Sequence, residues 1–320
     1  MKILGTGSYL PVNVVTNEAL THLVDTSDEW IVERTGIRER RISKGEENSE
    51  QAIKAGRCAL EDSGLKPEDI ELIIVATVTS NYVTPSIACI VQEALGIPKA
   101  IAFDINAACA GFLYAMNTAR CFFASGMVNN ALIIGSETLS KITDYTDRQT
   151  CILFADASGA AVVQRDENER FWTELGADGT KHDVIHCKQK PLNNCLVEGK
   201  DEIDYIHMEG REVYKFVVKE IPLLIKRVIE KSGIDIENVK YFILHQANKR
   251  MNEIIAKKLG VSFDKFPCNI EKMGNTSAAS IPVLLDEINR KGMLQSGDYV
   301  LLSSFGAGMT WGASLFQWKC

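Results

Sequence analysis

Several features are missing from this 320-residue chain, and each absence excludes a class of protein. The nine cysteines are odd in number and scattered, and none forms a C-x-x-C pair, which argues against a zinc site or a disulfide framework and fits a reducing cytosol. No apolar run approaches the ~20 residues that span a bilayer. No long apolar run follows the first charge, Lys2, so no secretory signal peptide is expected.

Basic charge is also scarce. The chain has 35 Lys and Arg residues against 42 Asp and Glu residues, which gives a net charge of −7. A nucleic-acid partner requires a basic field that neutralises phosphates, so this balance argues against one. Hydrophobic residues make up 46% and charged residues 24% of the chain, as in an ordinary globular protein. The length predicts two domains or one large α/β unit.

What the chain does contain is an alternation of apolar runs and helix-like periodic runs. Near-continuous apolar runs are typical of parallel strands covered on both faces, and the strand–helix–strand order predicts a doubly wound sheet with right-handed crossovers. The predicted strands are residues 3–10, 70–78, 100–105, 131–135, 157–164, 171–177, 239–244, 298–304 and 309–318, and the predicted helices are 48–63, 84–96, 110–125, 211–232, 249–259 and 276–289.

A polar hexapeptide, residues 165–170, divides the chain near its midpoint. We interpret it as the connection between two halves, 1–168 and 169–320, although a solvated hairpin tip has the same composition. Both halves contain a strand, a polar turn and a helix in that order, which predicts a structural duplication. Residues 178–204 are polar and irregular, and a long excursion of this kind is often functional.

Cys109 lies where a predicted strand ends and a predicted helix begins. The free N–H groups and partial positive charge of a helix N-terminus favour a thiolate, so this place is expected to lower the pKa of Cys109. The alternative is an inert core thiol, because unpaired cysteines are among the most buried residues.

Three further turns carry groups that could meet this thiol. His245 follows the predicted strand 239–244, and ligands of open α/β sheets bind outside the carboxyl ends of strands. Asn275 precedes an apolar helix, and residues 306–308 (Gly-Ala-Gly) let backbone N–H groups approach a ligand. The alternatives are an ordinary histidine, a helix N-cap and a plain turn. Together, the Cys, His and Asn suggest thiolate chemistry on an acyl group.

These stretches resemble the β-ketoacyl-acyl-carrier-protein synthase III family, the initiating condensing enzymes of bacterial fatty acid synthesis in the thiolase superfamily. The resemblance runs nearly from end to end and implies an αβαβα sandwich of two similar five-stranded α/β halves, assembled as a homodimer. The stretches that carry it are AACAGF at 107–112, HQAN at 245–248, GNTSAAS at 274–280, and residues 5–11, 25–31, 34–40, 147–148 and 310–312.

By this resemblance Cys109 accepts the acyl group of an acyl-CoA, and the backbone N–H groups of Cys109 and Ala307 form the oxyanion hole. Malonyl-acyl-carrier protein then loses CO2, while His245 and Asn275 donate hydrogen bonds to the enolate oxygen. The carbanion attacks the acyl-enzyme and yields 3-oxoacyl-acyl-carrier protein. The resemblance implies no metal and no cofactor, because acyl-CoA is a substrate, and it implies a cytoplasmic enzyme without a membrane partner.

The resemblance also implies binding residues. An acidic carrier protein requires a local basic patch on a net-negative enzyme, and adenine stacks between a Trp and an Arg. The alternatives are solvated helix faces and a buried Trp beside solvated Arg residues. The implied CoA channel comprises Thr26, Trp30, Arg34, Arg148, Gly210 and Asn248, and the implied docking patch comprises Lys215, Lys249, Arg250, Lys257 and Lys258, with Arg250 the best match.

Two positions depart from the family pattern. Thr84 stands where the family commonly has a Phe that reaches across the dimer to close the acyl pocket, which Phe305 also borders. A smaller side chain leaves more volume, so acyl groups longer or bulkier than acetyl are expected to be accepted. Ala307 replaces the usual Gly and keeps its backbone donor only if its φ suits an Ala.

Other functions remain open on sequence alone. A sister enzyme that supplies starter units for polyketides would share the fold and the Cys, His and Asn. A non-catalytic protein of the same fold is disfavoured because all three residues are intact. A papain-like protease is disfavoured because its local Cys signature is absent.

Overall fold

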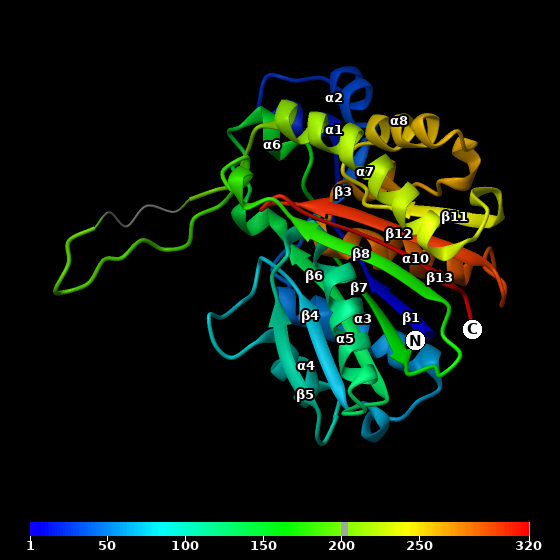
Figure 1. Ribbon diagram of the computed structural model, residues 1–320. Helices are drawn as coiled ribbons and strands as arrows, with labels where there is room; N and C mark the ends of the chain where they lie inside the picture. The colour runs from blue at the N-terminus through cyan, green and yellow to red at the C-terminus, as the bar shows by residue number, and fades with distance from the viewer. Residues whose placement is uncertain (200–203, 320) are drawn as a thin grey trace.

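The computed structural model describes residues 1–199 and 204–319, so residues 200–203 of the predicted excursion and Cys320 lie outside it. Its elements in chain order run from β1 to β7 and then from β8 to β13 (Figure 1). The first group comprises β1 (Lys2–Tyr9), β2 (Val14–Thr16), α1 (Asn17–Thr21), α2 (Asp28–Thr35), β3 (Glu39–Arg41), α3 (Asn48–Ser63), β4 (Leu72–Ala76), α4 (Ile87–Ala94), β5 (Ile101–Ile105), α5 (Gly111–Ala124), β6 (Asn130–Thr138), α6 (Arg148–Cys151) and β7 (Asp156–Gln164). The second comprises β8 (Phe171–Ala177), β9 (Ile185–His186), β10 (His207–Met208), α7 (Gly210–Ser232), β11 (Val239–Leu244), α8 (Lys249–Leu259), α9 (Ile270–Met273), α10 (Ser280–Arg290), β12 (Tyr299–Gly306) and β13 (Thr310–Gln317).

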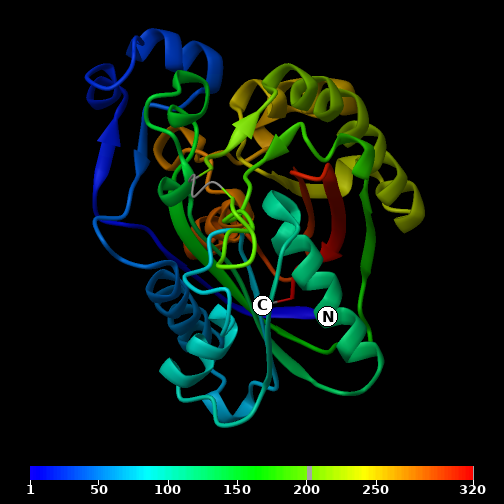
Figure 2. The ribbon, with the colours of Figure 1, turned by 90° about the vertical axis from the view of Figure 1, so that its left-hand side faces the viewer.

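Two sheets and three helical layers form the αβαβα sandwich that the resemblance implied (Figures 1 and 2). The first sheet has the order β1-β7-β6-β4-β5, and the second has the order β11-β12-β13-β8. Helices α3 and α4 cover the outer face of the first sheet, and α7 covers the outer face of the second with α8 beside it. Helices α5 and α10 lie between the sheets and share one apolar core with both. The predicted α/β fold class is therefore confirmed.

The prediction of parallel strands is met only in part: β4 runs parallel to β5 and β6, and β11 runs parallel to β12. Strand β7 runs antiparallel to both of its neighbours, β1 and β6, and β13 runs antiparallel to β12 and β8. Long apolar runs indicate that both faces of a sheet are covered by helices. An antiparallel strand in such a sheet is buried as fully as a parallel one. The apolar pattern therefore carries information about layers but not about strand direction.

The second sheet also has four strands among the described residues, where five were implied. By position in the chain, the counterpart of β5 would lie after α8. That segment instead forms a 3-10 turn at Phe263–Lys265 and the short helix α9. Pro267 stands between these two elements, and a proline has no N–H to donate to a strand ladder.

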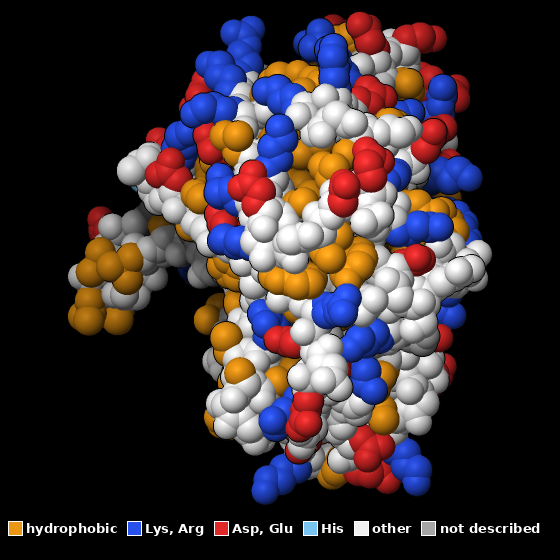
Figure 3. All heavy atoms as spheres, turned by 45° about the vertical axis from the view of Figure 1, so that its right-hand side comes forward, with side chains coloured by type: hydrophobic (Ala, Val, Ile, Leu, Met, Phe, Trp, Pro, Cys, Tyr) orange, Lys and Arg blue, Asp and Glu red, His pale blue; other side chains and the backbone are white. Residues whose placement is uncertain are grey.

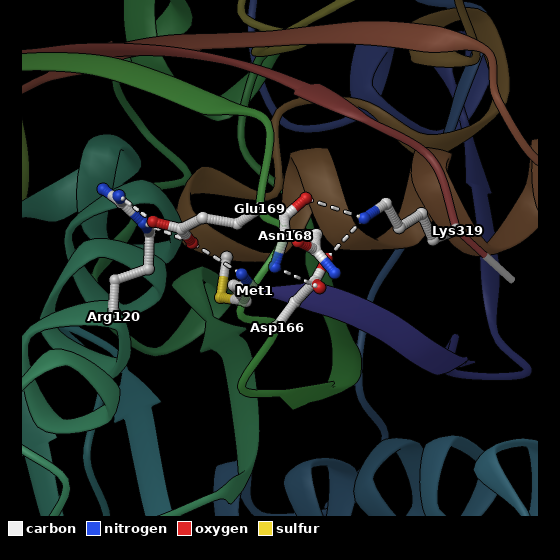
Figure 4. Close-up of polar contacts among 6 residues, drawn as sticks. All are labelled: Met1, Arg120, Asp166, Asn168, Glu169 and Lys319. Carbon is white, nitrogen blue, oxygen red and sulfur yellow. Dashed lines mark hydrogen bonds and ion pairs between the residues drawn. The ribbon is translucent and has the colours of Figure 1, made fainter.

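The polar hexapeptide 165–170 connects the two sheets rather than forming a hairpin tip, because β7 belongs to the first sheet and β8 to the second. Glu169 pairs with the N-terminal amino group and with Arg120 of α5 (Figure 4). Lys319, near the other end of the chain, bonds Asp166 at 2.6 Å and the carbonyl of Asn168 at 3.0 Å. The connection is thus anchored to both ends of the chain.

Local sequence signals account for the regular elements. Helix α3 begins where Glu50 accepts a hydrogen bond from the backbone N–H of Glu47 (3.0 Å), and it ends at Gly64, whose φ of 70° suits a glycine. It buries a stripe of small residues that includes Ala52, Ala55 and Ala59. None of the described helices combines the length and the apolar character needed to cross a bilayer.

The excursion after β8 is largely irregular, as predicted. Its short ribbon pairs β9 with β10, and residues 188–199 project away from the body of the protein (Figure 1). Residues 188–190 at the base of this projection line the main cavity, which links the excursion to the candidate site.

Candidate active site

The turn that carries Cys109 connects β5 to α5. The side-chain oxygen of Asn106 accepts a hydrogen bond from the backbone N–H of Ala108 (3.3 Å), and Ala108 adopts a φ of 46°. A short 3-10 turn, Ala108–Ala110, then leads into α5 at Gly111. A non-glycine residue at positive φ is sterically costly, and such strain persists where the surrounding structure imposes it.

The strand ends on either side of the loop between β12 and β13 impose this conformation. Ser304 donates to the carbonyl of Cys109 (2.6 Å), and Thr310 donates to the carbonyl of Ala107 (3.0 Å). A Cβ atom on Gly306 would lie only 2.6 Å from the backbone nitrogen of Cys109, so this position requires a glycine. The second half of the chain therefore holds the nucleophile turn of the first half in place.

Ala307 lies in the same loop with an ordinary backbone conformation. Among the described residues, positive φ outside glycine occurs at Ala108 and Ser277 only. The condition set for Ala307 by the sequence is therefore met, because its φ suits an Ala.

His245 directly follows β11 and is almost fully buried, with 1% of its surface exposed. Its backbone N–H continues the ladder to the carbonyl of Ser303 (2.9 Å), and its ring packs edge-on against Phe305 at 5.3 Å between centroids. Burial lowers the pKa of His245 to about 3, so the imidazole is neutral at physiological pH. Its Nδ1 atom has no hydrogen-bond partner among the described residues.

Asn275 is fixed by its own backbone and by its side-chain oxygen. Its N–H donates to the carbonyl of Leu153 (2.9 Å), and its carbonyl accepts from the N–H of Ala155 (2.9 Å). Its Oδ1 accepts from the N–H of Ser277 (2.9 Å), which leaves the NH2 end of the amide as the group that can donate to a ligand. Asn275 is thus a turn residue as well as a candidate donor.

One cavity of about 930 Å³ brings these side chains together. The sequence predicted them at separate strand and helix ends, and Cys109, His245, Asn275, Phe305 and Ala307 all line this cavity. The sequence did not predict its basic rim, because the excursion matched the family too poorly for any residue to be transferred. The rim residues are Lys141, His182, His186, Lys188 and Lys190.

The expected lowering of the Cys109 pKa is wrong. Burial raises the pKa of the Cys109 thiol to about 12, and the negative charge of Glu137 acts in the same direction, while a hydrogen bond with Ser277 opposes them. The loss of water around the sulfur outweighs the influence of the helix N-terminus. The resting site therefore contains a thiol and a neutral imidazole, and the thiol must lose its proton when it attacks.

None of the predicted CoA residues lines the cavity, and four of them, Trp30, Arg34, Arg148 and Asn248, form a separate cluster. The guanidinium groups of Arg34 and Arg148 lie over the Trp30 ring, at 4.5 Å and 4.7 Å from its centroid. Asn248 donates to the carbonyl of Arg34 (2.7 Å) and caps α8 by accepting from the N–H of Arg250 (2.9 Å). This capping is an alternative reason for an Asn at that position.

Two other predicted CoA residues lie in α7 and before α2. The hydroxyl of Thr26, just before α2, is buried and has no hydrogen-bond partner among the described residues. Gly210 begins α7, where a Cβ atom would meet open space. No contact joins Gly210 to the Trp30 cluster in the described structure, so its predicted role stays a prediction.

The predicted docking residues lie on two helices, α8 and α7. Lys249 and Arg250 begin α8, two residues after Ala247, which lines the cavity. Lys257 and Lys258 lie about 12 Å further along the same helix. Lys215 lies on α7 and pairs with Glu212 at 2.6 Å. On the face shown in Figure 3, basic side chains concentrate toward the top, the height of α2 and α8 in Figure 1, among acidic ones.

Thr84 is exposed and does not line the cavity of its own chain, although Tyr82 and Val83 do. The resemblance placed this residue across a dimer, so its effect on acyl length stays a prediction.

Two residues that the sequence did not single out border the nucleophile. Glu137 is fully buried near the end of β6; the hydroxyl of Ser277 donates to Glu137 and lowers the pKa of Cys109. The signal that could have found Glu137 resembles the one that selected His245: a titratable residue close to the end of a buried apolar run, here two residues after residues 131–135. Within residues 1–199 and 204–319, no group of three or more His, Cys, Asp or Glu side chains could hold a metal ion.

Comparison with known proteins gives consistent results over the whole chain. The family profile described as 3-oxoacyl-[acyl-carrier-protein (ACP)] synthase III matches residues 103–179, and the profile of its C-terminal part matches residues 229–318. A relative from Clostridium acetobutylicum, named beta-ketoacyl-[acyl-carrier-protein] synthase III, is 50% identical over 99% of this chain and 98% of its own.

Solved structures agree in fold. The 3-oxoacyl-[acyl-carrier-protein] synthase III of Aquifex aeolicus VF5 superposes with a TM-score of 0.92 at 44% identity, covering 99% of both chains. The priming β-ketosynthase of the R1128 polyketide pathway also gives a TM-score of 0.92, at 31% identity, covering 99% of this chain and 96% of its own.

Proposed function

Because the chain belongs to the 3-oxoacyl-[acyl-carrier-protein] synthase III family, we propose that it condenses an acyl-CoA with malonyl-acyl-carrier protein to initiate fatty acid synthesis. The products are 3-oxoacyl-acyl-carrier protein, CoA and CO2. The observation that carries the proposal is the single cavity into which Cys109, His245 and Asn275 all face.

Cys109 is the nucleophile that forms the acyl-enzyme, since it lines the cavity and its turn is held by Ser304 of β12 and Thr310 of β13. The backbone N–H groups of Cys109 and Ala307 form the oxyanion hole. His245 and Asn275 then stabilise the enolate that decarboxylation creates. A neutral imidazole and an amide NH2 suit this role, because the developing oxyanion needs hydrogen-bond donors rather than a base.

Acyl-CoA enters with its adenine against Trp30, held by Arg34 and Arg148. The acyl-carrier protein docks beside the cavity on Lys249 and Arg250, with the basic rim adding attraction for an acidic partner and for phosphates. The reaction needs no further cofactor, because the thiol supplies the nucleophile and loss of CO2 generates the carbanion.

The chain acts as a homodimer that pairs through β5. This strand ends the first sheet, and none of its five residues is fully buried. Exposed apolar side chains at Ile101, Tyr82 and Val83 lie on it and on the loop that contains Thr84. An exposed apolar edge strand can pair with a strand of another chain, so we expect a second copy of this chain to pair with β5.

We further propose that 1–168 and 169–320 are duplicated halves and that the enzyme works in the cytoplasm without a membrane partner. The eight described cysteines are all unpaired, which supports a reducing compartment.

The decisive experiment weighs the intact protein after incubation with a panel of acyl-CoAs, from acetyl to branched five-carbon groups. The expected result is one acyl adduct, absent in Cys109→Ala, which is consumed when malonyl-acyl-carrier protein is added. If no donor gave an adduct, the proposed reaction would be wrong. If acetyl-CoA reacted far better than all longer and branched donors, the role proposed for Thr84 would be wrong.

The polyketide alternative is less well supported. The relatives named beta-ketoacyl- or 3-oxoacyl-[acyl-carrier-protein] synthase III are 50% and 44% identical to this chain, against 31% for the priming β-ketosynthase of the polyketide pathway. The same adduct experiment, followed by transfer to the two kinds of carrier protein, distinguishes them.

A further inference from the structure

A carboxylate is buried directly behind the Cys109 turn. Glu137 near the end of β6 has no exposed surface, and no ion pair within the described residues includes it. It accepts hydrogen bonds from the Thr79 hydroxyl (2.6 Å), the Val78 N–H (3.1 Å) and the Thr77 hydroxyl (3.3 Å). A buried carboxylate without a cation is costly to ionise, so its presence calls for an explanation.

Ser277 joins this carboxylate to the nucleophile. Its hydroxyl donates to Oε1 of Glu137 (3.2 Å), and Ser277 lines the same cavity as Cys109, where it lowers the pKa of the thiol. The turn that holds Ser277 is strained, with a φ of 48°, and it is fixed by Oδ1 of Asn275. The hydroxyl is therefore held between thiol and carboxylate, with Glu137 as its acceptor.

Two groups near the thiol could accept its proton, and their environments differ. Burial raises the pKa of Glu137 to about 7 and lowers that of His245 to about 3. A group that titrates near neutral pH accepts and returns a proton efficiently, whereas an imidazole with so low a pKa is a poor acceptor. The imidazole suits hydrogen-bond donation to the enolate, and the carboxylate suits the proton of the thiol.

We propose that Glu137 is a positioning residue that acts through Ser277: it stores the proton of Cys109 while the enzyme carries an acyl group. This inference rests on the proposed function and adds to it the destination of the thiol proton.

The proton balance closes over one turnover. When sulfur attacks the thioester, the thiol proton passes to Ser277 Oγ, and the hydroxyl proton of Ser277 passes to Glu137. The S–acyl bond forms, and CoA leaves as a thiolate that takes a proton from water. When the carbanion attacks the acyl-enzyme, the Cys109 thiolate leaves, and the proton of Glu137 returns to it through Ser277.

A purely structural role is the competing explanation, because Glu137 also ties the loop after β4 to the turn before α10. The two roles differ in the pH dependence of Cys109. A proton store makes the reactivity of the thiol level off above the pH at which Glu137 ionises. Without the store, the proton must leave directly for the solvent, and reactivity rises with pH up to the pKa of the thiol.

The test compares Glu137→Gln and Glu137→Asp with wild type and with Ser136→Ala, a buried control in the same strand whose hydroxyl bonds Asn48 rather than the relay. Cys109 acylation by acyl-CoA and its alkylation by iodoacetamide are both followed by intact mass between about pH 5.5 and pH 9. We expect acylation near pH 7 to slow about 100-fold in Glu137→Gln, with a rate that keeps rising with pH. In Glu137→Asp and in Ser136→Ala, the reactivity of Cys109 should level off at high pH, as it does in wild type.

Two results would overturn the inference: an unchanged rate in Glu137→Gln, or a lower rate with the pH profile of wild type, which would indicate a structural role. Alkylation requires no substrate. If no acyl-CoA acylated even the wild type, the proposed function would fail, while the alkylation profiles would still decide whether Glu137 serves the thiol.

Discussion

Two turns in this protein have the same construction and different chemistry. Residues 106–111 lead into α5, and residues 275–280 lead into α10. In each, an Asn side chain accepts the N–H of the residue two positions later, and that residue, Ala108 or Ser277, has a φ near 47°. Cys109 in the first turn corresponds to Ala278 in the second. The same turn conformation therefore occurs twice in the fold, and only one of the two turns carries a thiol.

The strand ends beside the turns show the same contrast. The pairing of β4 with β6 and of β11 with β12 aligns Ala76 with Gly135 and Leu244 with Ser303. Thr77 and His245 directly follow Ala76 and Leu244, and Glu137 and Phe305 stand two residues after Gly135 and Ser303. The first half therefore contributes a thiol and an acid, and the second contributes hydrogen-bond donors and an apolar wall. If the two halves are duplicates, as proposed above, they share this backbone geometry and differ in the chemistry of single residues.

The sharpest test of this comparison moves the thiol from one turn to the other. We expect Cys109→Ala to lower acyl transfer to below about one-thousandth of the wild-type rate, because no other group can form the acyl-enzyme. Adding Ala278→Cys should restore nothing, since Ala278 is 1% exposed and packs into the central core. Intact mass after incubation with acyl-CoA is the measurement. An acyl adduct on the double variant would show that the two turns are interchangeable.

The two asparagines provide a matched pair. Asn275→Ala and Asn106→Ala each remove one turn hydrogen bond, worth about 1 kcal/mol of stability. Only Asn275→Ala removes a proposed enolate donor, so decarboxylation of malonyl-acyl-carrier protein should fall about 100-fold or more in that variant alone. Release of CO2 and urea unfolding measure the two effects. Equal losses of activity would mean that Asn275 acts only as a turn residue.

The residues proposed to bind acyl-CoA outside the cavity also differ between the two halves. Trp30→Ala removes the ring under Arg34 and Arg148, and we expect the KM for acyl-CoA to rise about 10-fold with kcat little changed. Asn248→Ala, in the second half, should mainly destabilise α8, by about 1 kcal/mol. Steady-state kinetics and thermal unfolding of both variants check this. A larger KM effect for Asn248 would move CoA recognition to the second half.

The smallest expected effect concerns stability. Burial raises the pKa of Glu137 from 4.5 to about 7 and lowers that of His245 from 6.5 to about 3. Between about pH 4.5 and pH 6.5, Glu137 is protonated in the folded state and ionised in the unfolded state. The contribution of Glu137 to the free energy of unfolding therefore falls as the pH rises. The His245 term has the opposite sign there, because only the unfolded state binds its proton.

The two terms therefore offset each other in the wild type. As the pH rises from about 5 to about 6.5, the free energy of unfolding of His245→Gln should fall relative to that of wild type, and that of Glu137→Gln should rise. Each slope should be at most about 1.4 kcal/mol per pH unit. Urea unfolding at several pH values measures the slopes. Slopes of the same sign in both variants would contradict the opposed environments.

Much of the fold was predictable because its signals are local. Helices α3 and α8 and strand β11 have the predicted bounds, since their periodicity and their terminal Gly or Asn residues lie within the segment itself. The direction of β7 was not predictable, because it does not depend on a local pattern. The second sheet has four strands within the described residues, and Pro267 was the one local sign against a fifth after α8.

For the site, the sequence by itself determined the candidates: Cys109, His245 and Asn275 stand at element ends, where backbone geometry exposes side chains. Only the tertiary structure decided that they share one cavity, that the thiol is protonated, and that Glu137 stands behind it. Burial, and the pKa shifts it causes, are sums over atoms from segments far apart in the chain. No stretch of sequence contains that sum, whereas the folded protein does.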